Sequence, residues 1–170
     1  MSDVTSIARS RSEKAVWDIL THVPDPEIPA VSVVDLGIVR EVRVGGDAVE
    51  VVITPTYSGC PATDVIARDV AAALHKNGYP DARVTTSLSP AWTTDWITDE
   101  GREKLRAFGI APPPRMERRI KSLLGEEPPV ACPRCGSTDT KKVSNFGSTP
   151  CKAHFTCNAC LEPFDHFKCL

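Results

Sequence analysis

Cysteines are the residues of this chain best suited to chemistry, and six of the seven lie after residue 130. Two Cys-x2-Cys pairs, Cys132/Cys135 and Cys157/Cys160, are separated by twenty-one residues. Two such pairs can supply four thiolates to one tetrahedral zinc ion, and a closed set of four leaves no position for substrate or water. The spacing therefore predicts a zinc ribbon with a structural Zn2+ ion.

Other residues near these pairs could join or replace the four ligands. Cys151 and His154 have chelating spacing, as do His154 and Cys157, and Cys151 with Cys169 could hold a second ion. A single histidine such as His154 or His166 is more often an ordinary packing or surface residue. The sequence does not decide which of these additional residues bind a metal ion.

The remaining cysteine, Cys60, lies in the stretch TPTYSGCPAT of residues 54–63. A strand-like pattern precedes it and a helical pattern follows, so its thiol is predicted to lie at a helix N-terminus. Free N–H groups and the helix dipole there stabilise a thiolate, which favours a reactive or metal-binding cysteine. The alternative is a buried, small apolar residue.

Three carboxylates, Asp25, Glu27 and Asp35, form a second candidate group on predicted turns ahead of Cys60. Carboxylates in such a group could bind a metal ion. Their commoner use is to cap turns and helix ends. Both interpretations stay open.

Composition and charge limit the class of protein. The chain has 170 residues, of which 41% are hydrophobic and 25% charged, as expected for one ordinary domain plus a small module. The net charge of −2 gives no global reason to expect nucleic acid or an anionic membrane as partner. With no run of eighteen apolar residues and no basic start followed by an apolar stretch, we expect a cytoplasmic protein.

Periodicity predicts a small α+β domain at the N-terminal end. A capping box at Ser10–Glu13 precedes a helix, and residues 25–44 have strand-like content with Gly37 inside. A hairpin turn at residues 45–47 leads to a strand over 49–54, a helix from Pro61 to Gly78 and a strand over 84–88. This order predicts a mixed sheet with helices on one face.

A short helix is predicted beyond the sheet, capped by Thr98 or Asp99, with Leu105 and Phe108 directed inward. The predicted limits are 10–110 for the α+β domain with its helical extension, 111–130 for a proline-rich linker and 131–170 for the ribbon. The ribbon holds few aliphatic residues, so we expect it to need the metal ion to fold.

Several of these segments resemble a known family. The stretches DPEIPAVSVVDLGIVREV and TPTYSGCPATDV are similar to the two signature segments of the DUF59, or MIP18-like, domain of iron–sulfur cluster assembly factors. Together with LSPAWTTDWITDEGREKLRAFGIAPP and the terminal cysteine pattern, the resemblance narrows to the D-subunit family (PaaD or PaaJ) of bacterial phenylacetyl-CoA epoxidases. The resemblance covers nearly the whole chain.

The resemblance implies an accessory role in phenylacetate catabolism, beside the oxygenase and reductase subunits of a di-iron monooxygenase that forms the ring epoxide. It implies delivery of iron or an Fe–S cluster, with Cys60 as the contact and Asp25, Glu27 and Asp35 as matching acidic positions. The chain has no Glu-x2-His for a di-iron centre of its own, so no catalytic residue is assigned. Because DUF59 relatives often self-associate, a homodimer is a further expectation.

Three other functions compete with this interpretation. The first is a stoichiometric docking subunit of the oxygenase that uses the ribbon with Trp92 and Trp96. The second is nucleic-acid binding by the ribbon and the basic stretch of residues 102–121, although the ribbon carries only five basic against three acidic residues. The third, catalysis by Cys60 as nucleophile, has no neighbouring base in the sequence to support it.

Overall fold

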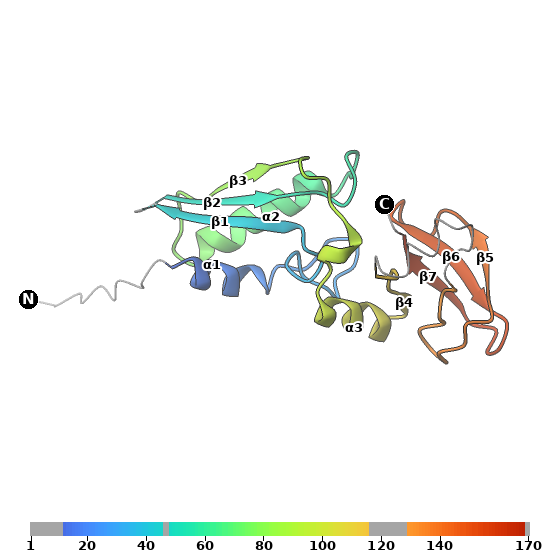
Figure 1. The fold of residues 1–170 in the computed structure, drawn as a ribbon. Coiled ribbons are helices and arrows are strands. Elements are labelled where there is room, and N and C mark those ends of the chain that lie inside the picture. The colour runs from blue at the N-terminus through green and yellow to red at the C-terminus, as the bar shows by residue number, and fades with distance from the viewer. Residues whose placement is uncertain (1–11, 46–47, 116–128, 169–170) are drawn as a thin grey trace, which may run out of the picture.

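The computed structural model of the chain describes residues 12–45, 48–115 and 129–168. Within these residues, an N-terminal sheet has the strand order β1-β2-β3 and a C-terminal sheet has the order β4-β7-β6-β5. Helices α1 and α2 lie against one face of the N-terminal sheet, and α3 lies between that sheet and the C-terminal one (Figure 1). The chain is thus an α+β domain followed by a small β module.

The N-terminal elements follow the predicted order of helix, strand, strand, helix, strand. Their bounds are α1 Glu13–Leu20, β1 Val39–Gly45, β2 Ala48–Ile53, α2 Thr63–Lys76 and β3 Arg83–Thr86. Strands β1 and β2 pair antiparallel, and β2 and β3 pair parallel. The predicted mixed sheet with helices on one face is therefore confirmed.

The core of this domain lies between the sheet and the two helices. Val16 and Leu20 of α1, and Val70 and Leu74 of α2, are fully buried, as is Val51 of β2. Burial alternates along β2, as the half-buried pattern of the sequence predicted. This packing fixes the end of β2 relative to the start of α2, which is where Cys60 lies.

Two local predictions at the N-terminal side were wrong. The N-cap of α1 is Ser12, whose hydroxyl accepts a hydrogen bond from the N–H of Ala15, so Glu13 is the first helical residue; Ser10 of the predicted capping box lies outside the described residues. Residues 25–38 form turns, and β1 begins only at Val39. Gly37 lies in a turn with φ of 66°, and a Cβ there would also collide with the carbonyl oxygen of Trp96, so only glycine fits this position.

The helical extension packs closely on the loop before β1. Its elements are the 3-10 helix η1, Thr94–Trp96, and α3, Asp99–Ala107. Thr98 caps α3, as one of the two predicted possibilities, and its N–H donates to the carbonyl of Asp35 at 2.9 Å. Leu105 is buried as predicted, but Phe108 is 54% exposed because α3 has already ended there.

The C-terminal module is a sheet of short strands. Their bounds are β4 Ile110–Ala111, β5 Thr140–Ser144, β6 Lys152–Cys157 and β7 Pro163–Phe167. Strands β5, β6 and β7 are antiparallel, whereas β4 pairs parallel with β7. The predicted boundary at residues 110–111 thus falls inside a strand of this sheet, and the domain limits stay a prediction.

The module and the N-terminal domain share one core. Phe167, at the end of β7, is 1% exposed and packs against Trp92 with 6.0 Å between ring centroids. Cys151 and Ile110 belong to the same buried cluster. The rigid edge of the ribbon therefore lies directly against the domain that carries Cys60. Among the helices of the described residues, none is long and apolar enough to cross a bilayer.

Candidate metal centres

Four cysteine sulfurs converge in the ribbon. The Sγ atoms of Cys132, Cys135, Cys157 and Cys160 all lie within 4.8 Å of one another. Cys132 and Cys160 are 3.8 Å apart, and Cys135 and Cys157 are 3.6 Å apart. A tetrahedral ion with Zn–S bonds of about 2.3 Å needs sulfurs about 3.8 Å apart. The predicted ligands thus already have the spacing that zinc requires.

Two equivalent turns place these sulfurs. The N–H of Gly136 donates to the carbonyl of Cys132 at 2.9 Å, and the N–H of Leu161 donates to the carbonyl of Cys157 at 3.0 Å. Both closing residues are left-handed, with φ of 77° at Gly136 and 63° at Leu161. In the second turn the N–H of Cys160 also approaches the sulfur of Cys157, at 3.5 Å. The chain folds each Cys-x2-Cys pair into a chelating turn.

The four thiols cannot ionise independently at this spacing. Hydrogen bonds from the N–H groups of Cys160 and Ala159 lower the pKa of Cys157 to about 7. The N–H of Glu162 acts in the same direction on Cys160, but desolvation and the neighbouring sulfurs raise its pKa to about 12. Several thiolates this close together need a cation among them, which is the electrostatic condition of a metal site.

The additional candidate ligands do not join this cluster. His154, in β6, faces the carboxylate of Asp165 at 3.4 Å. Cys151 lies in the buried cluster of the N-terminal domain, away from the four clustered sulfurs. Cys169 lies outside the described residues.

Cys60 lies on the turn between β2 and α2 and is partly buried. Its carbonyl accepts hydrogen bonds from the N–H and the hydroxyl of Thr63, the first residue of α2. The N-cap of that helix is Ala62. Cys60 thus precedes the helix and is not in its first turn. The helix dipole therefore stabilises a thiolate at Cys60 less than the sequence predicted.

The acidic residues of the signature segment divide between two roles. The carboxylate of Asp25 accepts the N–H groups of Glu27 and Ile28 at 2.9 and 2.8 Å, which caps the turn that contains them. Burial raises the pKa of Asp25 despite these bonds. Glu27 is only partly buried, and its Oε2 lies 3.9 Å from the sulfur of Cys151. Asp25 thus caps a turn at the cavity, whereas Oε2 of Glu27 lies beside the Cys151 sulfur.

Asp35 is placed elsewhere. Its carboxylate accepts the N–H of Ser32 at 2.8 Å and the ammonium group of Lys104 at 2.9 Å. Burial alone would raise the pKa of Asp35, but these bonds outweigh it and hold the pKa below its ordinary value. Asp35 is not among the residues that line the cavity at Cys60. The structure gives it the task of holding α3 against the loop before β1.

A small cavity joins the Cys60 turn to the ribbon. Cys60, Glu27 and Asp25 line one side of it, and Cys151 and Phe167 line the other. Its volume is about 10 Å³, enough for about one water molecule or one ion. Cys151 and Glu27 are 124 positions apart in the chain, so no local sequence signal could pair them. Only the docking of the ribbon brings the two cysteines to one cavity.

Further groups near this cavity were missed in the sequence. The pKa of Tyr57 is raised by burial and by the neighbouring Cys60, Glu27 and Cys151 groups. Lys152 is 4% exposed, and its Nζ lies 4.0 Å from the carboxylate of Asp165. Burial also raises the pKa of Cys151, and Glu27 adds to this rise. Lys152 directly follows Cys151 in the chain, but the sequence does not reveal that this lysine is buried, so it gave no signal.

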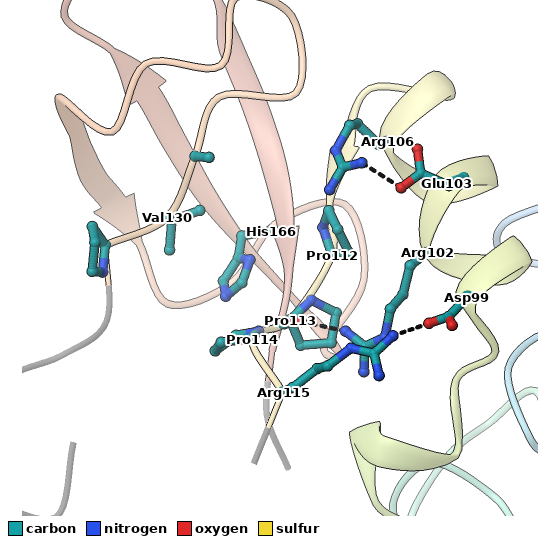
Figure 2. Close-up of a pocket in the computed structure, with 12 residues that line it drawn as sticks. Asp99, Arg102, Glu103, Arg106, Pro112, Pro113, Pro114, Arg115, Val130 and His166 are labelled. Atoms are coloured by element: carbon teal, nitrogen blue, oxygen red, sulfur yellow. Dashed lines mark hydrogen bonds and ion pairs between the residues drawn. The ribbon is translucent and has the colours of Figure 1, made fainter. Parts of the chain in front are cut away.

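A wider cavity of about 530 Å³ lies at the seam between α3 and the ribbon (Figure 2). Its arginines come from the predicted basic stretch, and each one shown is paired. Arg106 bonds Glu103 at 2.5 Å, Arg115 pairs with Asp99, and Arg102 donates to main-chain carbonyls, including that of Thr94 at 2.7 Å. The arginines drawn at this cavity are thus bonded to neighbouring groups of the protein. The predicted basic residues Arg118, Arg119 and Lys121 lie outside the described residues.

Comparison with known proteins matches two separate parts of the chain to two families. Residues 13–86 match the iron–sulfur cluster assembly protein family, and residues 117–168 match the PaaD zinc beta ribbon domain. The crystal structure of a DUF59 domain from Bacillus anthracis superposes with a TM-score of 0.52 at 27% identity, covering 55% of this chain and 90% of that one. The fold and the cysteine cluster thus define an iron–sulfur assembly-type domain joined to a zinc ribbon.

Two proteins are also similar to this chain in amino-acid sequence. A proposed D subunit of 1,2-phenylacetyl-CoA epoxidase from Escherichia coli (strain K12) is 47% identical over 156 residues, which cover 91% of this chain and 92% of the relative. An Fe-S protein maturation auxiliary factor from Porphyromonas gingivalis (strain ATCC BAA-308 / W83) is 35% identical over 97 residues, covering 56% of this chain and 91% of the relative. The chain belongs to the family of phenylacetyl-CoA epoxidase D subunits.

Proposed function

We propose that this protein is an accessory subunit of a phenylacetyl-CoA epoxidase and that it supplies iron, as an ion or an Fe–S cluster, to the oxygenase or its reductase. The observation that carries the proposal is the cavity at Cys60, where a thiol and the Glu27 carboxylate meet on an iron–sulfur assembly-type domain. Thiolate and carboxylate are ligands that iron accepts. The partners are the oxygenase and reductase subunits, in the cytoplasm.

The ribbon has a different task in this proposal. Cys132, Cys135, Cys157 and Cys160 hold a structural zinc ion, for which the spacing of their sulfurs is the supporting observation. A closed set of four thiolates leaves no position for catalysis. The zinc ion thus shapes the ribbon, and the ribbon completes the core around Phe167.

The test is the maturation of the oxygenase in the presence of defined variants. The oxygenase subunits are expressed with wild-type protein, with Cys60→Ser, with Ser58→Ala as a control in the same exposed turn, or with none. We expect wild type and Ser58→Ala to give an oxygenase with a full complement of iron and epoxidation activity. Cys60→Ser should give an iron-poor oxygenase, and equal iron content with Cys60→Ser would contradict delivery through this thiol.

A second experiment, removal of the protein from matured oxygenase, separates delivery from docking. If the protein is a permanent docking subunit, its removal from matured oxygenase abolishes epoxidation while the iron stays in place. If it delivers iron, matured oxygenase keeps its activity after removal. The docking alternative loses one of its predicted contacts, because Trp92 is 5% exposed and its indole N–H donates to the carbonyl of Leu36. Trp96 is half-buried, with the guanidinium of Arg40 3.5 Å from its ring centroid.

A further inference from the structure

Cys151 is the one described ribbon cysteine that lies outside the zinc cluster. It immediately precedes β6, is 4% exposed and packs into the core of the N-terminal domain. Its sulfur lies 3.9 Å from Oε2 of Glu27 and lines the same small cavity as Cys60.

The ribbon holds this thiol in a fixed place. The carbonyl of Cys151 accepts the N–H of Lys168 at 2.9 Å, just beyond the β6–β7 pairing. Its sulfur contacts the hydroxyl of Thr149 at 3.0 Å. The ring of Phe167 anchors the same edge against Trp92. These contacts hold Cys151, at the start of β6, on the side of the ribbon that faces the Cys60 turn.

The size and donor set of the cavity select the ligand. A volume of about 10 Å³ admits about one ion and excludes a preformed Fe–S cluster. Two thiolates and one carboxylate suit a divalent first-row transition metal such as Fe2+, and they do not suit Mg2+ or Ca2+, which require oxygen ligands. The buried ammonium group of Lys152 lowers the pKa of Asp25 and of Cys151 through its charge, which partly opposes the effect of their burial.

We propose that Cys60, Cys151 and Glu27 form a site for a single divalent transition-metal ion, assembled from both modules of one chain. This inference rests on the proposed function and adds that the iron is carried as a single ion and not as an Fe–S cluster. Among the described residues, only the four zinc-cluster cysteines form a group of three or more donor atoms within 4.8 Å of one another, so the three donors of this second site have to move closer together to share one ion. Cys60 is the donor with room to move, because it is only partly buried and its neighbours Ser58 and Gly59 are exposed. An open turn of this kind suits an ion that must be released.

The test is an anaerobic titration of zinc-loaded protein with Co2+, whose absorption reports bound thiolates. Wild type should take one Co2+ per chain with near-ultraviolet thiolate-to-cobalt absorption, while its zinc content stays constant. Cys60→Ser and Cys151→Ser should each weaken binding at least about tenfold and reduce that absorption by about half. Glu27→Gln should weaken Co2+ binding but leave the thiolate-to-cobalt absorption of the bound ion unchanged. Glu103→Gln, an exposed carboxylate change on α3, should match wild type.

Several results would overturn the inference. If Cys151→Ser keeps wild-type affinity and absorption while Cys60→Ser loses both, Cys151 is not a ligand, and delivery through Cys60 still stands. If wild type takes no second ion, the site does not exist as described, and the iron content of the matured oxygenase still decides the proposed function. Because Cys151 is buried, Cys151→Ala is titrated in parallel, and unchanged zinc content and melting temperature show that each variant is folded.

Discussion

The two cysteine sites of this molecule are built in opposite ways. The zinc cluster takes its four sulfurs from two short turns of one module, and those sulfurs already lie within 4.8 Å of one another. The Cys60 cavity takes its groups from a turn of the N-terminal domain and from the edge of the ribbon, and these groups do not cluster within 4.8 Å. A site that must never release its ion is local and closed, whereas a site for a transferable ion is assembled by docking and can open. The following changes test that contrast.

The largest effect is expected from loss of the zinc cluster. Cys157→Ser, or a strong chelator, should unfold the ribbon, because a module of this size depends on metal binding worth on the order of 10 kcal/mol. The N-terminal domain should stay folded, while the second site loses its Co2+ affinity together with Cys151. Two-dimensional NMR with parallel Co2+ titration measures both effects. A ribbon that keeps its native spectrum without metal would contradict the structural role of zinc.

Phe167→Ala should come next, because it removes the ring that joins the two modules. The ring is 1% exposed, so its loss should cost about 3–5 kcal/mol in the free energy of unfolding. Phe146→Ala, a change in a ribbon ring that is 68% exposed, is the matched control and should stay within about 0.5 kcal/mol. Urea unfolding measures both. Equal losses would mean that the ribbon does not depend on this contact.

Asp35→Asn should destabilise the chain by about 2 kcal/mol at pH 7, because a buried, hydrogen-bonded carboxylate loses its charge. The pKa of Asp35 is held below its ordinary value in the folded state. Its contribution is therefore present above the unfolded pKa of about 4 and disappears as the pH falls through the folded value. Unfolding curves from pH 7 to pH 3 should show the variant and wild type converging in acid. An exposed change, Asp81→Asn, should show no such convergence.

The smallest effects should come from the closing residues of the two zinc turns. At Gly136 a Cβ would meet no atom within 4 Å, so Gly136→Ala tests φ alone and should cost about 1 kcal/mol, about fivefold in zinc affinity. Leu161→Gly relieves the same strain but adds freedom to the unfolded chain, so it should change affinity by less than about threefold. Competition with a chelator measures both. A larger loss for Leu161→Gly would show that the exposed leucine has a contact of its own.

Much of the fold was predictable because local patterns and the tertiary structure agree. The order of elements, the Thr98 cap of α3 and Gly78 beyond α2 followed from periodicity and capping rules. The failures occurred where one residue type fits two environments. Phe108 follows the apolar spacing of α3 but lies past its end, and the N-cap of α1 is Ser12, two positions after the predicted one. Short-range rules cannot choose between such neighbours, because packing at the helix ends decides.

The sequence by itself determined the zinc cluster, because each Cys-x2-Cys spacing makes a turn that brings its two sulfurs together whatever surrounds it. It also determined that Cys60 follows a strand and precedes a helix. Only the tertiary structure separated Asp35, tied to Lys104, from Glu27, which faces the cavity. Only the docking of the ribbon placed Cys151 there, because contacts across 124 positions depend on how two surfaces pack and leave no periodic trace in the chain.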